Sequence, residues 1–256
     1  MILINRERTE KPANRPVYEA KLARDASEVQ RAQRLRFEVF NLELNEGLAE
    51  SHFTGLDVDP FDTVCDHLVV EHILTGQIVG TYRLQTGERA AANIGYYSER
   101  EFDFAPYESV RSETIELGRA CVHAGHRNFN LLHLLWRGIA NYARDHDARF
   151  LVGCSSLASQ DPLEGVLMYQ ELGKRFLARP EFRTEPQAEF RCGLRNALDS
   201  PPTTNHASAK LLRAYLTIGA KICGPPAIDR EFGTIDFLTL LDLRDLAPMV
   251  RSHFQR

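Results

Sequence analysis

The feature that most constrains the fold is a strand, turn, helix and strand succession in the middle of the chain. Thr114–Val122 is an apolar run of strand type, and Phe150–Cys154 is an uninterrupted apolar run typical of a buried strand. Between them, Asn130–Asp147 has the strongest helical period in the sequence. Its apolar face is formed by Leu131, Leu135, Ile139 and Tyr142. A chain that contains this unit must build an α/β structure in which the helix covers a sheet.

The flanking segments extend the same pattern. Leu68–Val70 and Gln77–Leu84, joined at Thr75-Gly76, predict a hairpin. Further strands are predicted at 18–23, 221–223 and 235–243. Further helices are predicted at 27–46 (Ser27 as N-cap, Gly47 at C′), 161–178 (Asp161 as N-cap), 206–219 and 246–254. Residues 85–112 are weakly periodic and 49–66 read as a polar loop. The sequence therefore predicts a mixed central sheet flanked by helices.

The chain length predicts one main domain. The 256 residues and 29.1 kDa suit a single large core, and no linker divides residues 17–256. Residues 1–16 are polar, contain Pro12 and Pro16, and are expected to form a flexible arm. Residues 161–205 are expected to be an inserted helical excursion before the late helix.

The charge excludes a general nucleic-acid binder. Lys and Arg total 31 and Asp and Glu total 35, so the net charge is 31 − 35 = −4. The charged residues are unevenly distributed along the chain, however. Residues 21–36 hold five bases against Asp25 and Glu28, a local balance of +3, whereas 57–66 hold four acids and no Lys or Arg. An acidic protein partner therefore remains compatible with the sequence.

The sequence predicts a cytoplasmic protein without a resident cofactor. The apolar start is three residues long, far short of a signal peptide. The five cysteines are widely spaced and read as free thiols in a reducing compartment. No spacing of His, Cys and acids predicts a metal site.

The turn before the central helix is a candidate anion site. Gly125, Asn128 and Asn130 tolerate turn conformations, and Arg127 adds a positive charge. The free N–H groups at a helix N-terminus attract phosphate. An ordinary polar turn is the alternative reading.

This unit resembles motif A of the Gcn5-related N-acetyltransferase (GNAT) superfamily, which wraps the pyrophosphate of coenzyme A. Its pattern is Arg/Gln-x-x-Gly-x-Gly/Ala, and the matching turn here is Arg127-Asn-Phe-Asn130, with the glycines replaced. Leu211–Cys223 resembles the late helix and strand of that superfamily. The resemblance implies a GNAT-like fold.

A narrower resemblance covers most of residues 18–245. Its blocks, in order, are Arg36-x-x-x-Phe40, Asp57-x-Asp59-x-Phe61-Asp62, Gly80-Thr-Tyr-Arg83-Leu, Glu116-x-x-Arg119, Cys154-Ser-Ser-Leu, Asp161-Pro162 and Gly219–Asp229. They resemble acyl-homoserine-lactone synthases and, more closely, the bacterial ornithine-lipid N-acyltransferases, often labelled hemolysin-like.

That resemblance implies transfer of a long, 3-hydroxylated acyl chain from acyl carrier protein to the α-amine of an amino acid. The implied acceptor is ornithine, and the product a lyso-ornithine lipid that partitions into the inner membrane, where peripheral contact is expected. The acyl-phosphopantetheine of the carrier would be a co-substrate, bound at Val122, Arg127, Asn128 and Asn130. The implied catalytic residues are Glu116 and Arg119.

Glu116 is the candidate general base, because the attacking amine is mostly protonated at pH 7. A salt bridge between Glu116 and an arginine is the alternative. Backbone N–H groups around Ala120–Val122 are candidate oxyanion donors, and no nucleophilic side chain is required.

Arg36, Phe40, Asp57, Asp59, Asp62 and Arg83 are the candidate substrate-binding residues. The aspartates suit the ammonium groups of a cationic acceptor. They equally suit an internal network with Arg36 and Arg83, and a calcium loop is a third interpretation, although the run lacks the glycine and final Glu of an EF-hand.

Three other functions stay open at this point: a lactone-forming signal synthase, a coenzyme A-dependent acetyltransferase, and a non-catalytic module that binds acyl carrier protein. The product formed from acyl thioesters and amino acids distinguishes them.

Overall fold

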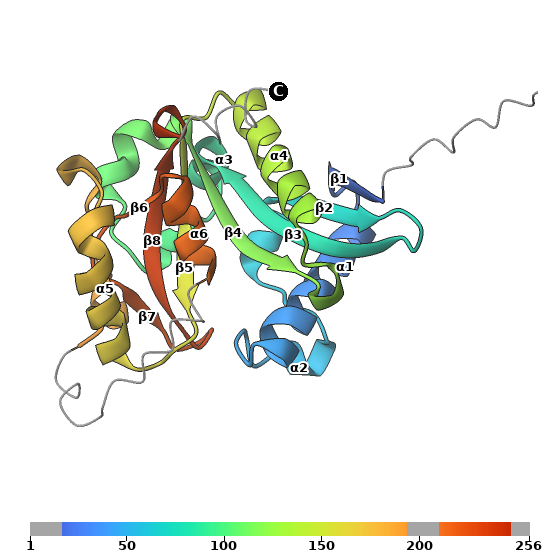
Figure 1. Cartoon of the computed structure of the whole chain (residues 1–256), viewed down its shortest axis with the longest axis horizontal. Coiled ribbons are helices and arrows are strands. Elements are labelled where there is room, and N and C mark those ends of the chain that lie inside the picture. The colour runs from blue at the N-terminus through green and yellow to red at the C-terminus, as the bar shows by residue number, and fades with distance from the viewer. Residues whose placement is uncertain (1–16, 194–209, 247–256) are drawn as a thin grey trace, which may run out of the picture.

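A computed structural model describes residues 17–193 and 210–246 of the chain. All of the described strands belong to one mixed sheet (Figure 1), with the order β1-β2-β3-β4-β5-β8-β6 and with β7 paired to β8. The strands are β1 (Tyr18–Leu22), β2 (Asp66–His72), β3 (Gln77–Thr86), β4 (Thr114–Val122), β5 (Phe150–Leu157), β6 (Lys221–Ile222), β7 (Ala227–Asp229) and β8 (Thr234–Asp242).

The helices cover both faces of this sheet. They are α1 (Ala26–Phe37), α2 (Ser51–Thr54), α3 (Gly87–Ala92), α4 (Phe129–Asp145), α5 (Pro162–Phe176) and α6 (Lys210–Ile218). In Figure 1, α4 and α6 lie on the face toward the viewer, and α1 and α3 lie behind the sheet. This arrangement confirms the predicted α/β class with a mixed sheet.

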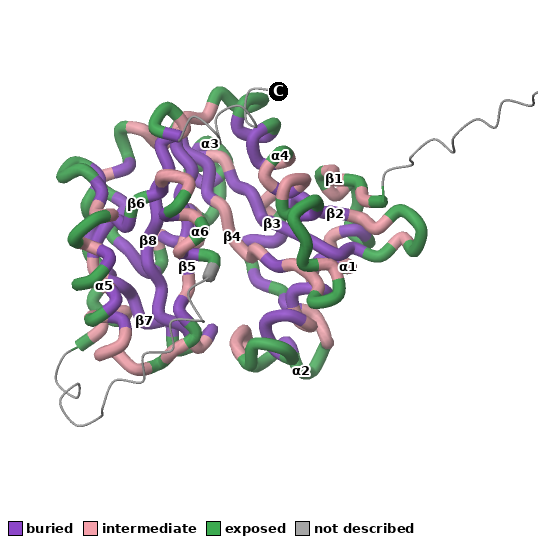
Figure 2. Tube along the Cα trace, viewed as in Figure 1, coloured by how far each residue is buried: buried purple, intermediate pink, exposed green. Residues whose placement is uncertain are grey.

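The sheet has two halves that differ in what covers them. The β1–β4 half is antiparallel and carries α4 on one face, through Leu131 and Leu135, and α1 on the other, through Leu35. The β5–β8 half packs against α5 and α6 through Leu172 and Leu216. Figure 2 shows that the strands are largely buried, whereas α2 and the β2–β3 turn are exposed. Each half therefore has its own core.

The two halves meet where β4 pairs with β5. This pairing is parallel and covers three positions only, Thr114–Glu116 against Phe150–Val152. Beyond them β4 continues beside β3 while β5 continues beside β8. A β-bulge bends β4 at this point, because its register against β3 shifts between Thr81 and Arg83 and Arg119 has a φ of 49°. The remaining residues of β4 and β5 face each other without a shared ladder.

Gly153 occupies the position where the two strands separate. A Cβ at this residue would lie 2.2 Å from the carbonyl oxygen of Leu117. Only glycine therefore allows β5 to pass this close to β4.

The predicted helix 27–46 begins and ends differently from the sequence expectation. Asp25, not Ser27, caps α1, and its carboxylate accepts from the N–H groups of Ser27 and Glu28. The predicted helix 27–46 is interrupted, since α1 ends at Phe37 and a π-helical segment continues over Glu38–Glu43. Gly47 has a φ of 86° but donates its N–H to Phe232, so it does not cap this helix.

Other predicted elements agree more closely with the structure. The predicted strand Thr114–Val122 coincides with β4, and Asp161 caps α5 with Pro162 at its first turn. The expected polar loop 49–66 contains α2 and a 3₁₀ turn over Pro60–Thr63. The predicted arm 1–16, part of the insertion and most of the predicted helix 246–254 lie outside the described residues.

None of the helices in the described ranges 17–193 and 210–246 is long and apolar enough to cross a bilayer.

The separation of β4 and β5 yields a stability prediction. We expect Gly153→Ala to destabilise the fold by roughly 1–3 kcal/mol, because the added methyl group overlaps the Leu117 carbonyl. The matched control is Gly118→Ala on the adjacent strand, where a Cβ meets nothing within 4 Å. Thermal unfolding should show a lower Tm for Gly153→Ala alone, by about 2–4 °C for each kcal/mol. Equal Tm values for the two variants would contradict this account.

Candidate functional site

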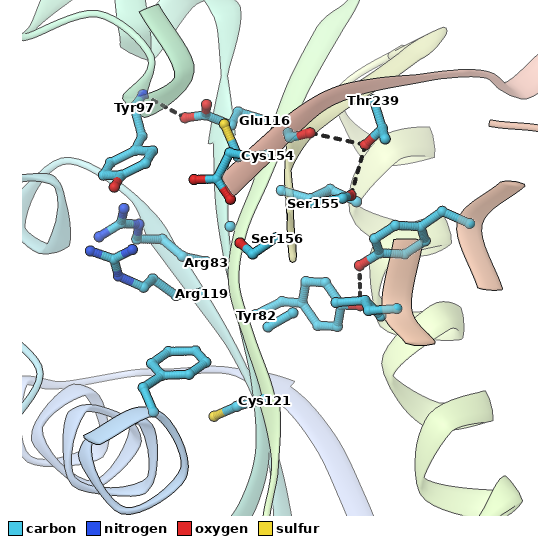
Figure 3. A pocket seen from close by; sticks show the side chains of 18 of the residues that line it. Tyr82, Arg83, Tyr97, Glu116, Arg119, Cys121, Cys154, Ser155, Ser156 and Thr239 are labelled. Atoms are coloured by element: carbon cyan, nitrogen blue, oxygen red, sulfur yellow. Dashed lines mark hydrogen bonds between the residues drawn. The ribbon is translucent and has the colours of Figure 1, made fainter. Parts of the chain in front are cut away.

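A cavity of about 560 Å³ opens where β4 and β5 separate. Its walls come from both strands and include Glu116 and Arg119 of β4 and Cys154 and Ser156 of β5 (Figure 3). Because neither strand pairs with the other here, the cavity runs directly beside strand backbone.

One wall of the cavity is apolar and aromatic. The Tyr82 and Tyr215 hydroxyls are 2.7 Å apart, and Trp136 packs edge-on against Tyr215 with ring centroids 5.7 Å apart. Leu117 and Leu241 complete this wall. Such a surface suits an acyl chain better than a charged group.

Glu116 lies on the polar side of the cavity. Its carboxylate accepts the N–H of Tyr97 at 2.8 Å, the N–H of Ser98 at 2.8 Å and the Ser98 hydroxyl at 2.6 Å. The side chain is buried, and burial raises the pKa of Glu116 although the Ser98 contacts oppose this. A carboxylate has about four lone-pair sites, so one site remains for a ligand.

Buried arginines and aspartates form a network behind this wall. Arg36 is fully buried and holds Asp62 through two hydrogen bonds, of 2.9 and 2.6 Å. Although burial opposes ionisation, the Arg36 guanidinium holds the pKa of Asp62 well below its usual range. Arg83 bonds Asp59 at 2.5 Å and Asp62 at 3.1 Å.

The network reaches the cavity through Arg83 and Arg119. Arg119 bonds Asp59 at 2.9 Å, and its guanidinium lies over the rings of Tyr97 (5.0 Å) and Phe232 (4.5 Å). Figure 3 shows Arg83 and Arg119 side by side below Tyr97. Both arginines therefore direct N–H donors toward the cavity, while the aspartates neutralise their charge.

The structure divides the predicted substrate-binding residues into two groups. Phe40 and Arg83 line the cavity. Asp57, Asp59 and Asp62 are buried against arginines and do not line it, which is the internal network that the sequence analysis left open. A direct contact of these aspartates with substrate finds no support in this geometry.

The predicted donor-binding turn lies at one edge of the cavity. Val122 and Arg127 line it, but the Arg127 guanidinium is engaged by Glu43 at 2.5 and 2.7 Å. Asn128 caps α4, its side chain accepting from the N–H of Leu131, and Asn130 stands in the first turn of that helix.

The backbone N–H of Val122 is directed away from β3, to the side on which β5 lies. His123 donates its N–H to Val79 on β3 at 2.9 Å. Because alternate residues of a strand direct their backbone groups to opposite sides, the N–H of Val122 points away from β3. At the position of Val122 along β4, β5 is no longer paired with β4.

The basic segment 21–36 is less basic at the surface than its sequence indicated. Lys21 and Arg24 bond Glu28 at 2.9 and 2.8 Å, and Arg31 lies 3.6 Å from the same carboxylate. Arg36 is buried in the network and adds nothing to the surface charge. Arg34 remains exposed.

Several residues that line or approach the cavity were not predicted from the sequence. Tyr97 and Ser98 lie in the weakly periodic segment 85–112, where a 3₁₀ turn spans Tyr97–Arg100. Asp236 also lines the cavity, and Glu101 approaches it behind Cys154. Asp236 had a signal in the sequence, since it is an acid between Ile235 and Phe237 in an apolar strand.

The two cysteines that line the cavity are poor nucleophiles. Burial raises the pKa of the Cys121 thiol and of the Cys154 thiol well above their ordinary value. Since the thiolate is the nucleophilic form, a covalent acyl-cysteine intermediate is disfavoured.

Comparison with known proteins gives a consistent assignment. Residues 35–137 match a family model described as an acetyltransferase (GNAT) domain. The chain is 34% identical over 254 residues to the L-ornithine N(alpha)-acyltransferase of Rhodobacter capsulatus, covering 93% of this chain and 95% of that protein. It is also 34% identical to the L-ornithine N(alpha)-acyltransferase of Agrobacterium fabrum over 248 residues, covering 92% of this chain and 84% of that protein.

A solved structure shares the fold. It is that of FeeM, an N-acyl amino acid synthase from uncultured soil microbes, with a TM-score of 0.54, 10% identity, and coverage of 92% of this chain and 96% of that one. At this identity the likeness concerns the fold alone. The fold, the GNAT domain and the two full-length relatives agree: the chain is an acyltransferase that belongs to the family of the L-ornithine N(alpha)-acyltransferases.

Proposed function

We propose that this acyltransferase moves a fatty acyl group, 3-hydroxylated by resemblance, from the thioester of acyl carrier protein to the α-amine of ornithine. The product is a lyso-ornithine lipid. The acceptor is supported by the names of the full-length relatives. The donor is supported by the resemblance of the sequence blocks to families that use acyl carrier protein.

The observation that carries this proposal is the cavity between β4 and β5. The Glu116 carboxylate, the β4 backbone over Ala120–Val122 and an aromatic wall surround one space there. A thioester needs these three features: a base for the amine, a donor for the carbonyl oxygen, and an apolar surface for the chain.

In the proposed reaction, Glu116 accepts a proton from the acceptor ammonium, directly or through water. The neutral nitrogen then attacks the thioester carbonyl. A backbone N–H of β4 stabilises the oxyanion as the C–N bond forms. The C–S bond breaks, the nitrogen gives its second proton to the departing phosphopantetheine thiolate, and the proton held by Glu116 passes to solvent. The phosphopantetheine thiol then leaves on the carrier. The protonated thiols of Cys121 and Cys154 take no part, so transfer is direct.

The network behind the cavity has a positioning role in this proposal. Asp59 and Asp62 hold the guanidinium groups of Arg83 and Arg119 in place. Those two arginines then face the carboxylate of the acceptor amino acid, and Phe40 forms part of the cavity wall. Asp57, between Arg36 and Arg119, completes the network.

The turn before α4 is the proposed site of the phosphopantetheine arm. Val122 supplies strand backbone to the amides of the arm, and the N-terminus of α4, with Asn128 and Asn130, faces its phosphate. Arg127 contributes charge once its contact with Glu43 is exchanged for the phosphate.

The role of Glu116 is tested by a pair of variants. We expect Glu116→Gln to lower kcat by roughly 10²–10⁴-fold, as loss of a general base does. Ser98→Ala removes the 2.6 Å hydrogen bond that favours the carboxylate form, so the pKa of Glu116 rises. Since the base works deprotonated, the acid limb of the kcat/KM profile should move to higher pH.

The kcat of Glu116→Gln and the pH profile of Ser98→Ala are measured by mass spectrometry of the acylated amino acid. Circular dichroism verifies that each variant is folded. A folded Glu116→Gln enzyme within a few-fold of wild-type activity would remove Glu116 as the base. An unmoved pH profile in Ser98→Ala would show that the acid limb belongs to another group.

The identity of the acyl donor is tested with the same acyl chain attached either to acyl carrier protein or to coenzyme A. We expect kcat/KM for the carrier-protein thioester to exceed that for the coenzyme A thioester by roughly tenfold or more, a difference of about 1.4 kcal/mol that protein contacts readily supply. Arg127→Ala should raise the KM for the donor, whereas Arg175→Ala, an exposed base on α5, serves as control. A preference for coenzyme A would contradict the carrier assignment.

Exposed apolar side chains on α2 and at the start of α4 support a membrane contact. Phe129 is 78% exposed at the start of α4 and Phe53 is 91% exposed on α2, and Leu44, which lines the cavity, is also exposed. We propose that this surface touches the inner membrane, into which the acylated product partitions.

Liposome flotation tests this contact. We expect the double variant Phe53→Ser, Phe129→Ser to float less than the wild type with phosphatidylethanolamine–phosphatidylglycerol vesicles, because it exposes less apolar area. Leu74→Ser is the control, since Leu74 is 86% exposed in the β2–β3 turn, apart from α2 in Figure 1. No flotation of the wild type, with or without product, would contradict the proposal.

A further inference from the structure

Two buried carboxylates stand together at the polar end of the cavity. Glu101 is 1% exposed and Asp236 is 3% exposed, and Asp236 lines the cavity. One carboxylate oxygen of each acid and the sulfur of Cys154 all lie within 4.8 Å of one another. Glu101 follows the 3₁₀ turn that holds Glu116, and Asp236 belongs to β8.

Neither carboxylate is fully satisfied by the described part of the chain. Glu101 Oε1 and Asp236 Oδ1 are buried and have no hydrogen-bond partner there. The charges that act most strongly on Glu101 are those of Asp236 and Asp229, which repel it. Burying two such acids side by side is unfavourable unless a cation or a proton joins them.

This pair differs from the aspartates of residues 57–62. Asp59 and Asp62 each bond an arginine of the chain at 3.1 Å or less. Among the described residues, no arginine or lysine pairs with Glu101 or Asp236, so the two acids remain open to a cationic ligand. Within the same ranges, arginines neutralise the cluster at 57–62.

The position of the pair relative to Glu116 matches a molecule with two amines. Ser98 donates its hydroxyl to Glu116 at 2.6 Å, and the Cys154 thiol lies 3.4 Å from the same hydroxyl oxygen. The Cys154 sulfur is in turn 3.7 Å from Glu101. One hydroxyl and one thiol therefore link the candidate base to Glu101 of the acid pair.

We propose that Glu101 and Asp236 bind the side-chain ammonium of the acceptor and so select a diamino acid over a neutral one. This inference rests on the proposed function and names the subsite that reads the acceptor. The α-amine then lies at Glu116, and the carbon chain passes Ser98 and Cys154.

The environment of the pair agrees with an ammonium rather than a metal ion. Burial raises the pKa of Asp236 to about 6 and raises the pKa of Glu101 well above its ordinary value, and the charge of Asp236 adds to the rise at Glu101. Burial also keeps the Cys154 thiol protonated, whereas a metal would need the thiolate. Glu46 also lines the cavity, and burial, together with the charge of Asp236, raises its pKa to about 7.

The test compares ornithine with norvaline, which has the same carbon skeleton without the side-chain amine. Both acceptors are assayed with one acyl-carrier thioester, in the wild type and in Asp236→Asn and Glu101→Gln. Loss of a charged hydrogen bond is worth roughly 1.5–3 kcal/mol, or about 10–100-fold. We expect the ratio of kcat/KM for ornithine to that for norvaline to fall by this factor, mainly through the KM for ornithine.

Glu99→Gln is the matched control, because Glu99 lies in the same 3₁₀ turn but pairs with Arg111. A second readout needs no turnover: ornithine should raise the Tm of the wild type and of Glu99→Gln, but not that of Asp236→Asn. This readout keeps the inference testable if Glu101→Gln does not fold.

Three outcomes would overturn the inference. One is equal loss for ornithine and norvaline in folded variants, which would make the pair structural. Another is a wild type that uses both acceptors equally. The third is a stoichiometric metal ion in the purified protein whose removal abolishes activity. A wild type that acylates no amino acid at all would instead overturn the proposed function, so the two failures are distinguishable.

Discussion

The parallel pairing of β4 with β5 ends after three positions, and the rest of the site depends on this separation. After Glu116 the two strands keep different partners, β3 and β8, and the ladder between β4 and β5 ends. The bulge at Arg119 turns β4 away, and Gly153 allows the last close contact before the strands part. A sheet that remained paired would have no cavity and no free strand backbone for a ligand.

Buried charge fixes the shape of the opening. Arg36 on α1, Arg83 on β3 and Arg119 on β4 converge on Asp57, Asp59 and Asp62, which lie in one short segment. Such a network is costly to bury and is rigid once its hydrogen bonds are made. Here the network holds Arg83 and Arg119 in one orientation at the cavity and cancels most of their charge.

The sequence predicted the parts of this structure that depend on local periodicity. β4 coincides with its predicted range and the helix after it begins within one residue of the expected position, since both have strong apolar patterns. The segment 85–112 could not be assigned, because 3₁₀ turns lack a long amphipathic period. Glu101 and Asp236 were missed for a different reason: they are 135 positions apart and only the sheet brings them together.

The two acidic clusters show why residue type alone does not locate a substrate site. The aspartates at 57–62 are the denser cluster in sequence and were natural candidates for a cationic acceptor. In the folded chain their charges are cancelled by arginines from three elements. Glu101 and Asp236 are far apart in sequence, and within the described part of the chain they meet without an arginine or lysine partner. An unbalanced charge that faces a cavity, rather than the number of acids in a segment, is what a cationic ligand can recognise.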